Sequence, residues 1–360
     1  MPNRLAKYRD VLGYFFLASV LAVACLLRKE QQFSSQASVA LTVQEPEPTR
    51  HEGLRSRLMR EASAGDIVSQ RQLGQSFLLG LDGERSETHA ATWFMKSAQK
   101  GDATAAYLLG NCYNEGRGVV MDQSQAARWW GVASLGGNDD AACMLAFARL
   151  KGKGVEMSPG EGVSLLLRAA ERGHSIAQFN VGLFHFEGHH LSKSYSDAFS
   201  WFRRSAVQGN PRAQSFVGLM YRDGLSVPLD YDQALLWLGF AIEKKESSAF
   251  YHLAEMHRDG LGIPKNDSKA SELFLRSANL GHVLSQLEIG TRYASGTGVT
   301  QDLVEGCAWF EVASSADARF ASSRDHMFSR LSASRRIQAR SRAESIRREI
   351  DAIRKAEKAP

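Results

Sequence analysis

Seven glycines recur at one fixed spacing along this chain, and they constrain its fold more than any other feature. They stand 36 residues apart, at Gly80, Gly116, Gly152, Gly188, Gly224, Gly260 and Gly296. A fixed period of this size is typical of an array of stacked repeats. No insertion interrupts the period between about residues 66 and 317. The spacing therefore predicts seven copies of one unit.

Other positions keep the same register and confirm the period. One column of large apolar residues comprises Trp93, Trp129, Leu165, Trp201, Trp237, Leu273 and Trp309. A column of small residues comprises Gly74, Gly110, Ala146, Gly182, Gly218, Ala254 and Gly290. We predict that the small residues let two backbones approach closely and that the tryptophans form the core. On that interpretation, replacing a fully buried Trp by Ala would cost about 3–5 kcal/mol.

Each copy is predicted to form two short helices. In the fifth copy, Ala213, Val217 and Met220 recur at helical spacing and mark one apolar stripe. The glycine of the 36-residue column should end the first helix, because glycine adopts the left-handed conformation without strain. The second helices should end at Gly101, Gly137, Gly173, Gly209 and Gly281, with Lys245 as an exception.

The second helices also carry start signals. The residue types preferred at an N-cap stand at Ser86, Asp122, Ser158, Ser194, Asp230, Asn266 and Asp302. Gln or Glu follows three residues later at Gln125, Glu161, Gln233 and Glu305, which predicts a capping box in four copies. Helices this short are marginal alone, so each must bury its stripe against its neighbours.

The combined pattern A-x-x-x-L-G-x-x-Y-x-x-G-x-G-V-x-x-D-x-x-x-A-x-x-W resembles the Sel-one-like repeat family, relatives of tetratricopeptide arrays. The clearest copy is carried by Ala105, Leu109, Gly110, Tyr113, Gly116, Gly118, Val119, Asp122, Ala126 and Trp129. Asp82 and His190 replace the second loop glycine in the first and fourth copies, so irregular loops are expected there. The resemblance implies a right-handed α-solenoid and an adaptor that holds a partner protein.

An apolar segment near the start of the chain favours a membrane anchor. Residues 11–27 carry no charge and are flanked by basic residues. A helix of this length spans about 26 Å, the short end of what crosses a bilayer. Two alternatives stay open: a signal peptide cleaved after Ala22-Val23-Ala24, and a lipoprotein signal that ends at Cys25. Three basic residues precede the segment and two follow it, which favours an extracytoplasmic, or in a bacterium periplasmic, repeat domain.

The remaining cysteines are predicted to be free. Cys112 and Cys143 stand in different columns of neighbouring first helices, too far apart in register for a disulfide, and with Cys307 they make an odd number of thiols. We expect all three thiols to serve as small buried apolar side chains.

The C-terminal segment is strongly basic. From Arg324 to Lys358 there are eleven Lys or Arg and five Asp or Glu. Because the whole chain carries +5, the preceding residues sum to −1, which argues against a general nucleic-acid surface on the repeats. Phe320, Met327, Phe328 and Leu331 are predicted to cap the last repeat. Beyond them Ile346, Ile350 and Ile353 form a narrow stripe, interpreted either as part of a solvated, partly frayed helix or as a contact for a membrane, nucleic acid or partner helix.

No sequence motif for catalysis carries weight. The chain contains no G-x-S-x-G, P-loop, H-E-x-x-H or C-x-x-C motif. His185, His189 and His190 cluster in the fourth copy and leave open a metal site, but Gly188 should end the helix before His189, so the i, i+4 geometry of two ligands on one helix is not secured. We predict no catalytic residue, no cofactor and no metal ligand, and we assign no binding residue.

The predicted fold is all-α: a right-handed α-solenoid of seven 36-residue helix–turn–helix repeats, with an N-terminal membrane-anchor helix and a basic C-terminal helix. The expected segments are 1–10 (short and basic), 11–27 (signal anchor), 28–53 (flexible stalk), 54–317 (repeats at about 66–101, 102–137, 138–173, 174–209, 210–245, 246–281 and 282–317), 318–334 (capping helix) and 335–360 (basic helical tail).

Two functional hypotheses follow. The first is a membrane-anchored scaffold that binds another protein along the solenoid face, contacts the bilayer through residues 11–27 and binds no specific nucleic acid. The second is a cell-envelope enzyme, or a repeat protein that binds a metal or small ligand, with the histidine cluster as its main support. The sequence favours the scaffold.

Overall fold

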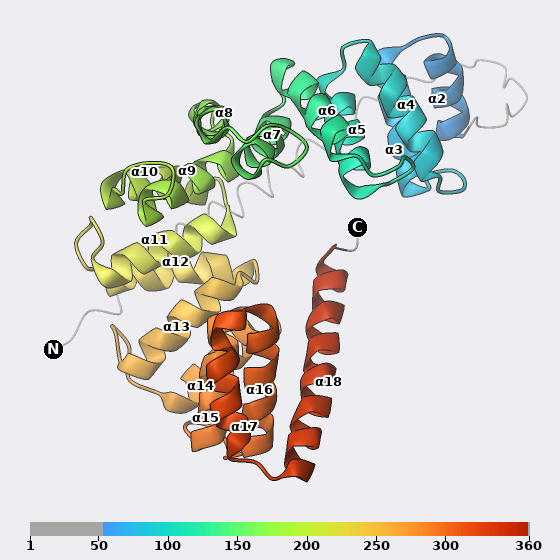
Figure 1. Ribbon diagram of the computed structural model, residues 1–360. Helices are drawn as coiled ribbons and strands as arrows, with labels where there is room; N and C mark the ends of the chain where they lie inside the picture. Colours follow the sequence, from blue (N-terminus) through green and yellow to red (C-terminus); the bar gives the residue numbers. More distant parts are fainter. Residues whose placement is uncertain (1–52, 359–360) are drawn as a thin grey trace, which may run out of the picture. The chain divides into compact units, whose positions relative to one another are not determined.

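The computed structural model describes residues 53–358, which form helices joined by short turns (Figure 1). The predicted anchor, residues 11–27, and almost all of the predicted stalk lie outside this range. The helices are α2 (Leu54–Ser63), α3 (Ile67–Leu79), α4 (Glu87–Gln99), α5 (Ala103–Glu115), α6 (Gln123–Leu135), α7 (Asp139–Lys151), α8 (Pro159–Glu171), α9 (Ser175–Glu187), α10 (Tyr195–Val207), α11 (Pro211–Asp223), α12 (Tyr231–Glu243), α13 (Ser247–Asp259), α14 (Asp267–Asn279), α15 (Val283–Ser295), α16 (Leu303–Ala316), the 3₁₀ helix η1 (Ala318–Phe320), α17 (Ala321–Ser329) and α18 (Ala333–Lys358).

Helices α3 to α16 pair into the seven predicted copies, and each helix packs mainly against the one before and the one after it. Residues 53–358 contain no strand, as the all-α prediction requires. None of the helices in this range is both long and apolar enough to cross a membrane.

Glycine sets where the helices end. Every glycine of the 36-residue column caps a first helix in the left-handed conformation, with φ between 64° at Gly224 and 79° at Gly188. Such φ values are unfavourable for most residues with a Cβ, and all seven glycines adopt them, so the prediction from the glycine column is confirmed. Lys245 adopts φ 57° at the end of the fifth second helix and so takes the role that glycine has in the other copies.

The helix starts follow the predicted N-caps with one exception. Six of the seven predicted residues accept a hydrogen bond from an amide of the first turn, whereas Ser158 makes no such bond. The predicted capping box is wrong. The N-cap amide donates to a carbonyl at the end of the preceding first helix, as in Asp122 N to Tyr113 O at 3.0 Å, and is therefore already satisfied.

The loops inside the copies are more regular than expected. His190 has φ 66° and Asp82 has φ 52°, the left-handed conformation that Gly118 adopts at φ 70° in the second copy. Ser226 does the same in the fifth copy with φ 64°. The prediction of an irregular fourth loop is therefore wrong, because a residue with a Cβ tolerates this conformation there.

A single large side chain fills the centre of each copy. A Cβ on Gly110 would lie 2.6 Å from Cδ1 of Trp130, so glycine leaves the space that the indole occupies. The equivalent side chains are Phe94, Trp130, Leu166, Phe202, Leu238, Phe274 and Phe310, all at most 7% exposed. This column lies one residue beyond the predicted tryptophan column. Trp93, Trp129 and Trp309 are also buried, but Trp201 and Trp237 are only half-buried, so the prediction holds for part of that column.

Additional helices cover both ends of the repeat array. At the N-terminal end, Leu58 and Ala62 of α2 pack on Leu73 and Trp93, a cap that the sequence did not reveal. At the C-terminal end, Met327, Phe328 and Leu331 are buried near Phe310, as predicted for the capping segment, whereas Phe320 is only half-buried and lies outside this cluster.

Helix α18 is packed, not solvated. It lies beside α16 and also contacts α14 (Figure 1). Ala343 and Ile346 are 0% exposed and Ile350 is 4% exposed, whereas Ile337 is 70% exposed. The interpretation of the isoleucine stripe as solvated and frayed is therefore wrong for Ile346 and Ile350, which belong to the core of the last copies.

Candidate interaction surface

The first helices of the copies combine a buried position that stays small with a partly exposed position that differs between copies. The residue two positions into each first helix is always Ala or Ser and is buried in every copy. Six residues further along, the side chain is partly or fully exposed and changes with each copy: Gln75, Asn111, Phe147, Leu183, Leu219, Glu255 and Thr291. We call this variable set the first-helix surface.

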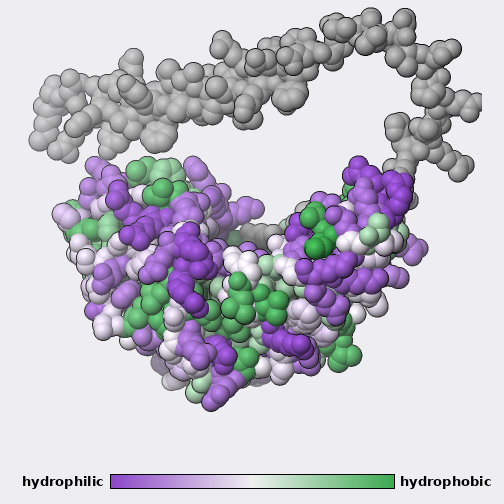
Figure 2. Space-filling view, turned by 90° about the horizontal axis from the view of Figure 1, so that it is seen from above, coloured by the Kyte–Doolittle hydropathy of each residue, from purple (hydrophilic) through white to green (hydrophobic). Residues whose placement is uncertain are grey.

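The middle of the first-helix surface is apolar. Phe147, Leu183 and Leu219 are half-buried in copies three to five. Behind them Phe216 packs against Phe202 with ring centroids 4.7 Å apart, which joins the surface to the core of the fourth copy. In Figure 2 most of the surface of the described residues is hydrophilic, and it is interrupted by several separate hydrophobic patches, one of them near the middle of the face shown.

An ion-pair network that includes Glu255 of the first-helix surface lies in copies five to seven. Arg222 of α11 lies 2.6 Å from Glu255 of α13, and Arg258 of α13 lies 3.5 Å from Glu288 of α15. These pairs link three consecutive copies. Burial disfavours the charge of Glu255, but hydrogen bonds from His252 and Arg222 outweigh it and lower the pKa of Glu255 to about 2.

A half-buried histidine lies beside this network. His282 is the N-cap of α15, and its Nδ1 accepts a hydrogen bond from the amide of Ser285 at 3.3 Å. Its ring packs against Tyr251 at 4.8 Å. Burial lowers the pKa of His282 to about 4, so the ring is neutral at pH 7 and Nδ1 stays an acceptor.

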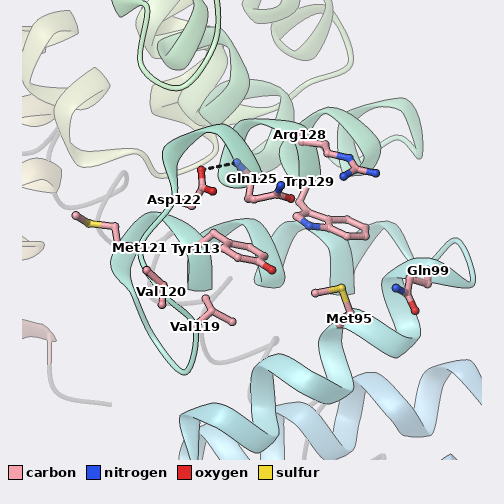
Figure 3. A pocket seen from close by; sticks show the side chains of 10 residues that line it. All are labelled: Met95, Gln99, Tyr113, Val119, Val120, Met121, Asp122, Gln125, Arg128 and Trp129. Carbon is pink, nitrogen blue, oxygen red and sulfur yellow. Dashed lines mark hydrogen bonds between the residues drawn. The ribbon is translucent and has the colours of Figure 1, made fainter.

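A hollow of about 720 Å³ opens between the second helices of the first two copies (Figure 3). Met95 and Gln99 of α4 line one side, and Gln125, Arg128 and Trp129 of α6 line the other. Tyr113 and the loop 119–122 close the remaining side. Val120 in this loop is 87% exposed. The lining combines aromatic and apolar side chains with two glutamines, one aspartate and one arginine, a composition suited to a protein ligand.

The predicted histidine cluster does not come together as a metal site. Nδ1 of His185 lies 3.0 Å from the carbonyl oxygen of Ser192, and His189 faces Glu187 at 3.2 Å. His190 instead packs edge-on against Phe184. Across residues 53–358 no group of three His, Cys, Asp or Glu side chains is placed to hold a metal ion.

The three cysteines of the repeats are free and buried, as predicted. Burial raises the pKa of Cys112 and Cys307 to about 11 and that of Cys143 to about 12. Thiols in this state are poor nucleophiles at neutral pH. They therefore act as packing groups.

Comparison with protein families identifies the repeated unit. The Sel1 repeat model matches seven consecutive segments, 67–102, 103–138, 139–174, 175–210, 211–245, 247–282 and 283–317. The chain belongs to the Sel1 repeat family. Sel1 repeat proteins generally mediate protein–protein interaction and are typically non-catalytic scaffolds. A comparison with curated proteins gave no significant match.

Solved structures agree with this family. A Sel1 repeat protein from Oxalobacter formigenes has 26% sequence identity and a TM-score of 0.63, covering 68% of this chain and 96% of its own. A protective antigen of uropathogenic Escherichia coli strains with an SLR fold has 24% identity and a TM-score of 0.52, covering 85% of this chain and 74% of its own. The latter similarity supports the fold alone.

Sequence reasoning missed the hollow and the ion-pair network. The sequence did hold a signal for the network. Arg222 and Arg258 occupy one repeat position that carries an apolar residue or asparagine in the earlier copies. The hollow had no such signal, because it depends on how much space the side chains of α4 and α6 leave between them.

Proposed function

We propose that this Sel1 repeat protein is a membrane-anchored scaffold that binds a partner protein along its first-helix surface. The observation that carries the proposal is the contrast between one buried position, which is always Ala or Ser in the seven stacked copies, and the partly exposed position six residues further along, which changes from copy to copy. A stacked array needs only the buried columns for stability, so the exposed ones are free to recognise a ligand.

The apolar part of the first-helix surface is the proposed centre of contact. Leu183 and Leu219 are half-buried apolar side chains, and the charged network of Arg222 and Glu255 borders them. An apolar centre with a polar rim is the usual anatomy of a protein interface. The paired charges of the network set the orientation of the partner more than its affinity.

Site-specific cross-linking tests this proposal. A photo-activated side chain placed at residue 183 or residue 219 of the full chain should form a discrete cross-linked product with one partner in living cells. The control position is Val207, which is 71% exposed on α10, a second helix. Products of equal yield from all three positions, or from none, would remove support for the first-helix surface.

The membrane anchor is a separate part of the proposal. The uncharged run of residues 11–27 and the basic residues around it support it. The same argument favours an extracytoplasmic repeat domain. The full chain should stay in the membrane fraction after an alkaline carbonate wash, and replacing Leu17 and Leu21 by Arg should release it. A chain recovered in the soluble fraction without these changes contradicts the anchor.

A further inference from the structure

Helix α18 fills a groove between two second helices at the C-terminal end of the array. It packs on α16 and α14, and Ala343, Ile346 and Ile350 share one buried cluster with Trp309 and Val312. Leu275 and Tyr293 pack against the same cluster. Arg342 of α18 donates to Glu305 at 2.8 Å, and Glu305 accepts from the indole N–H of Trp309 at 3.2 Å. We call this the α14–α16 groove.

The hollow near the N-terminal end is the same place in another copy. The equivalent positions lie five repeats, or 180 residues, earlier in the sequence. Met95 is equivalent to Leu275, Tyr113 to Tyr293 and Trp129 to Trp309. These three residues line the hollow between α4 and α6 (Figure 3). Val312 becomes Val132. We call this place the α4–α6 groove.

The other grooves between consecutive second helices lack this combination. The residues equivalent to Met95, Tyr113 and Trp129 are Gly131, Arg149 and Leu165 in the α6–α8 groove; Leu167, His185 and Trp201 in the α8–α10 groove; Arg203, Tyr221 and Trp237 in the α10–α12 groove; and Gly239, His257 and Leu273 in the α12–α14 groove. At the position of Val132 these copies carry Arg168, Arg204, Phe240 and Arg276. Only the α4–α6 groove repeats the large apolar, Tyr, Trp and Val set that holds α18.

The α4–α6 groove shows what is left exposed when no helix fills it. Val132 is 40% exposed, whereas Val312 under α18 is 4% exposed. The indole N–H of Trp129 is buried and has no hydrogen-bond partner, whereas that of Trp309 has Glu305. Gln125 stands where Glu305 does, but no side chain equivalent to Arg342 holds it against the indole. A helix in this groove would cover the valine and fix Gln125.

The two grooves carry different charges, so we expect them to bind helices of different charge. Gln125 replaces Glu305 and Arg128 replaces Ala308, so the α4–α6 groove has lost a negative charge and gained a positive one. Among residues 53–358 no acidic side chain forms an ion pair with Arg128, whose guanidinium carbon lies 5.9 Å from the centre of the Trp129 ring. A helix that carries a carboxylate where α18 has Arg342 would complement this arginine.

We propose that the α4–α6 groove binds an amphipathic helix of a partner protein, with a stripe of small and aliphatic residues and an acidic residue beside it. The carrying observation is that α18 occupies the equivalent groove five copies away with such a stripe. This inference rests on the proposed function, since it assigns a second contact to the same scaffold, but it uses a different face from the first-helix surface.

Two synthetic peptides test the inference. One has the sequence of residues 337–356 of α18, and the other carries Glu in place of Arg342 and Arg347, the two arginines that bond to Glu305 and Ser315 of α16. Binding of each labelled peptide to the full chain in detergent is measured by fluorescence anisotropy. The acidic peptide should bind with an affinity at least about tenfold higher than that of the native-sequence peptide.

Variants of the full chain locate the binding. Val132→Arg should weaken the acidic peptide about tenfold, because a buried valine contact is lost. The fold should tolerate this change, since Arg168 and Arg204 occupy the same position in the next two copies. Val207→Arg, on an exposed site of α10, is the matched control and should leave binding unchanged. Arg128→Glu should reverse the preference between the two peptides.

Three results would overturn the inference. These results are that neither peptide binds, that Val132→Arg changes binding no more than Val207→Arg does, or that the basic peptide binds more tightly to the unchanged chain. The last result would instead make a second copy of this chain the occupant. Cross-linking at the first-helix surface is independent of all three, so the proposed function can survive the failure of this inference.

Discussion

At the residue scale, a shift of one position decides which side chain is core. Phe202 is 0% exposed beneath Gly182, whereas its neighbour Trp201 is half-buried, with Arg204 4.7 Å from the centre of its ring. Both columns are large and apolar and both keep the 36-residue period, so periodicity alone could not rank them. The difference arises from the direction of each side chain on the second helix.

Replacing these two residues by alanine should give different losses of stability. Phe202→Ala should lower the free energy of unfolding by about 3–5 kcal/mol, because a cavity opens in the core. Trp201→Ala should lower the free energy of unfolding clearly less, since the indole of Trp201 is already partly exposed to water. Urea unfolding followed by circular dichroism measures both. Equal losses would contradict the assignment of the core column.

The pH dependence of stability should report on His282. Its pKa is about 4 in the folded chain and about 6.5 when unfolded, so its contribution is present above pH 6.5 and is lost as the pH falls toward 4. Between pH 7.5 and pH 5 the loss should be about 2 kcal/mol. His282→Asn keeps an N-cap of the kind found at Asn138 and Asn210 and should remove this part of the pH dependence. An unchanged pH profile would refute the assignment.

At the element scale, α18 shows what sequence periodicity could not predict. Its isoleucine stripe was visible, but the helix lies outside the 36-residue register, so no column could be compared to find its partner. The contact with α14 joins residues far apart in the sequence. The helices of the repeats were predictable for the opposite reason, because each cap and each glycine recurs in seven copies.

Substitutions within α18 should separate its packed face from its exposed face. Ile346→Ala should destabilise the C-terminal copies by about 2–5 kcal/mol, because Ile346 is fully buried against Trp309 and its neighbours. Ile337→Ala should have almost no effect, since Ile337 is 70% exposed. Hydrogen exchange of the amides in α16 measures the result. Fast exchange in both variants, or in neither, would contradict the packing of α18.

At the scale of the whole molecule, stability is local while binding surfaces extend over several copies. Each copy contacts its neighbours, so the array is stabilised step by step. The sequence predicted this organisation from the period. It could not predict that the α4–α6 and α14–α16 grooves are equivalent. That comparison depends on the position of α18, which the 36-residue period does not predict.

The most direct test of the scaffold is recovery of its partner from solubilised membranes. The full chain is compared with the double variant Leu183→Glu, Leu219→Glu and with Val207→Glu, whose side chain is exposed on α10. We predict one protein that is recovered with the unchanged chain and with Val207→Glu but is lost with the double variant, while all three chains keep the same helical content. Identical recovery from all three, or no protein that depends on the repeats, would contradict the account.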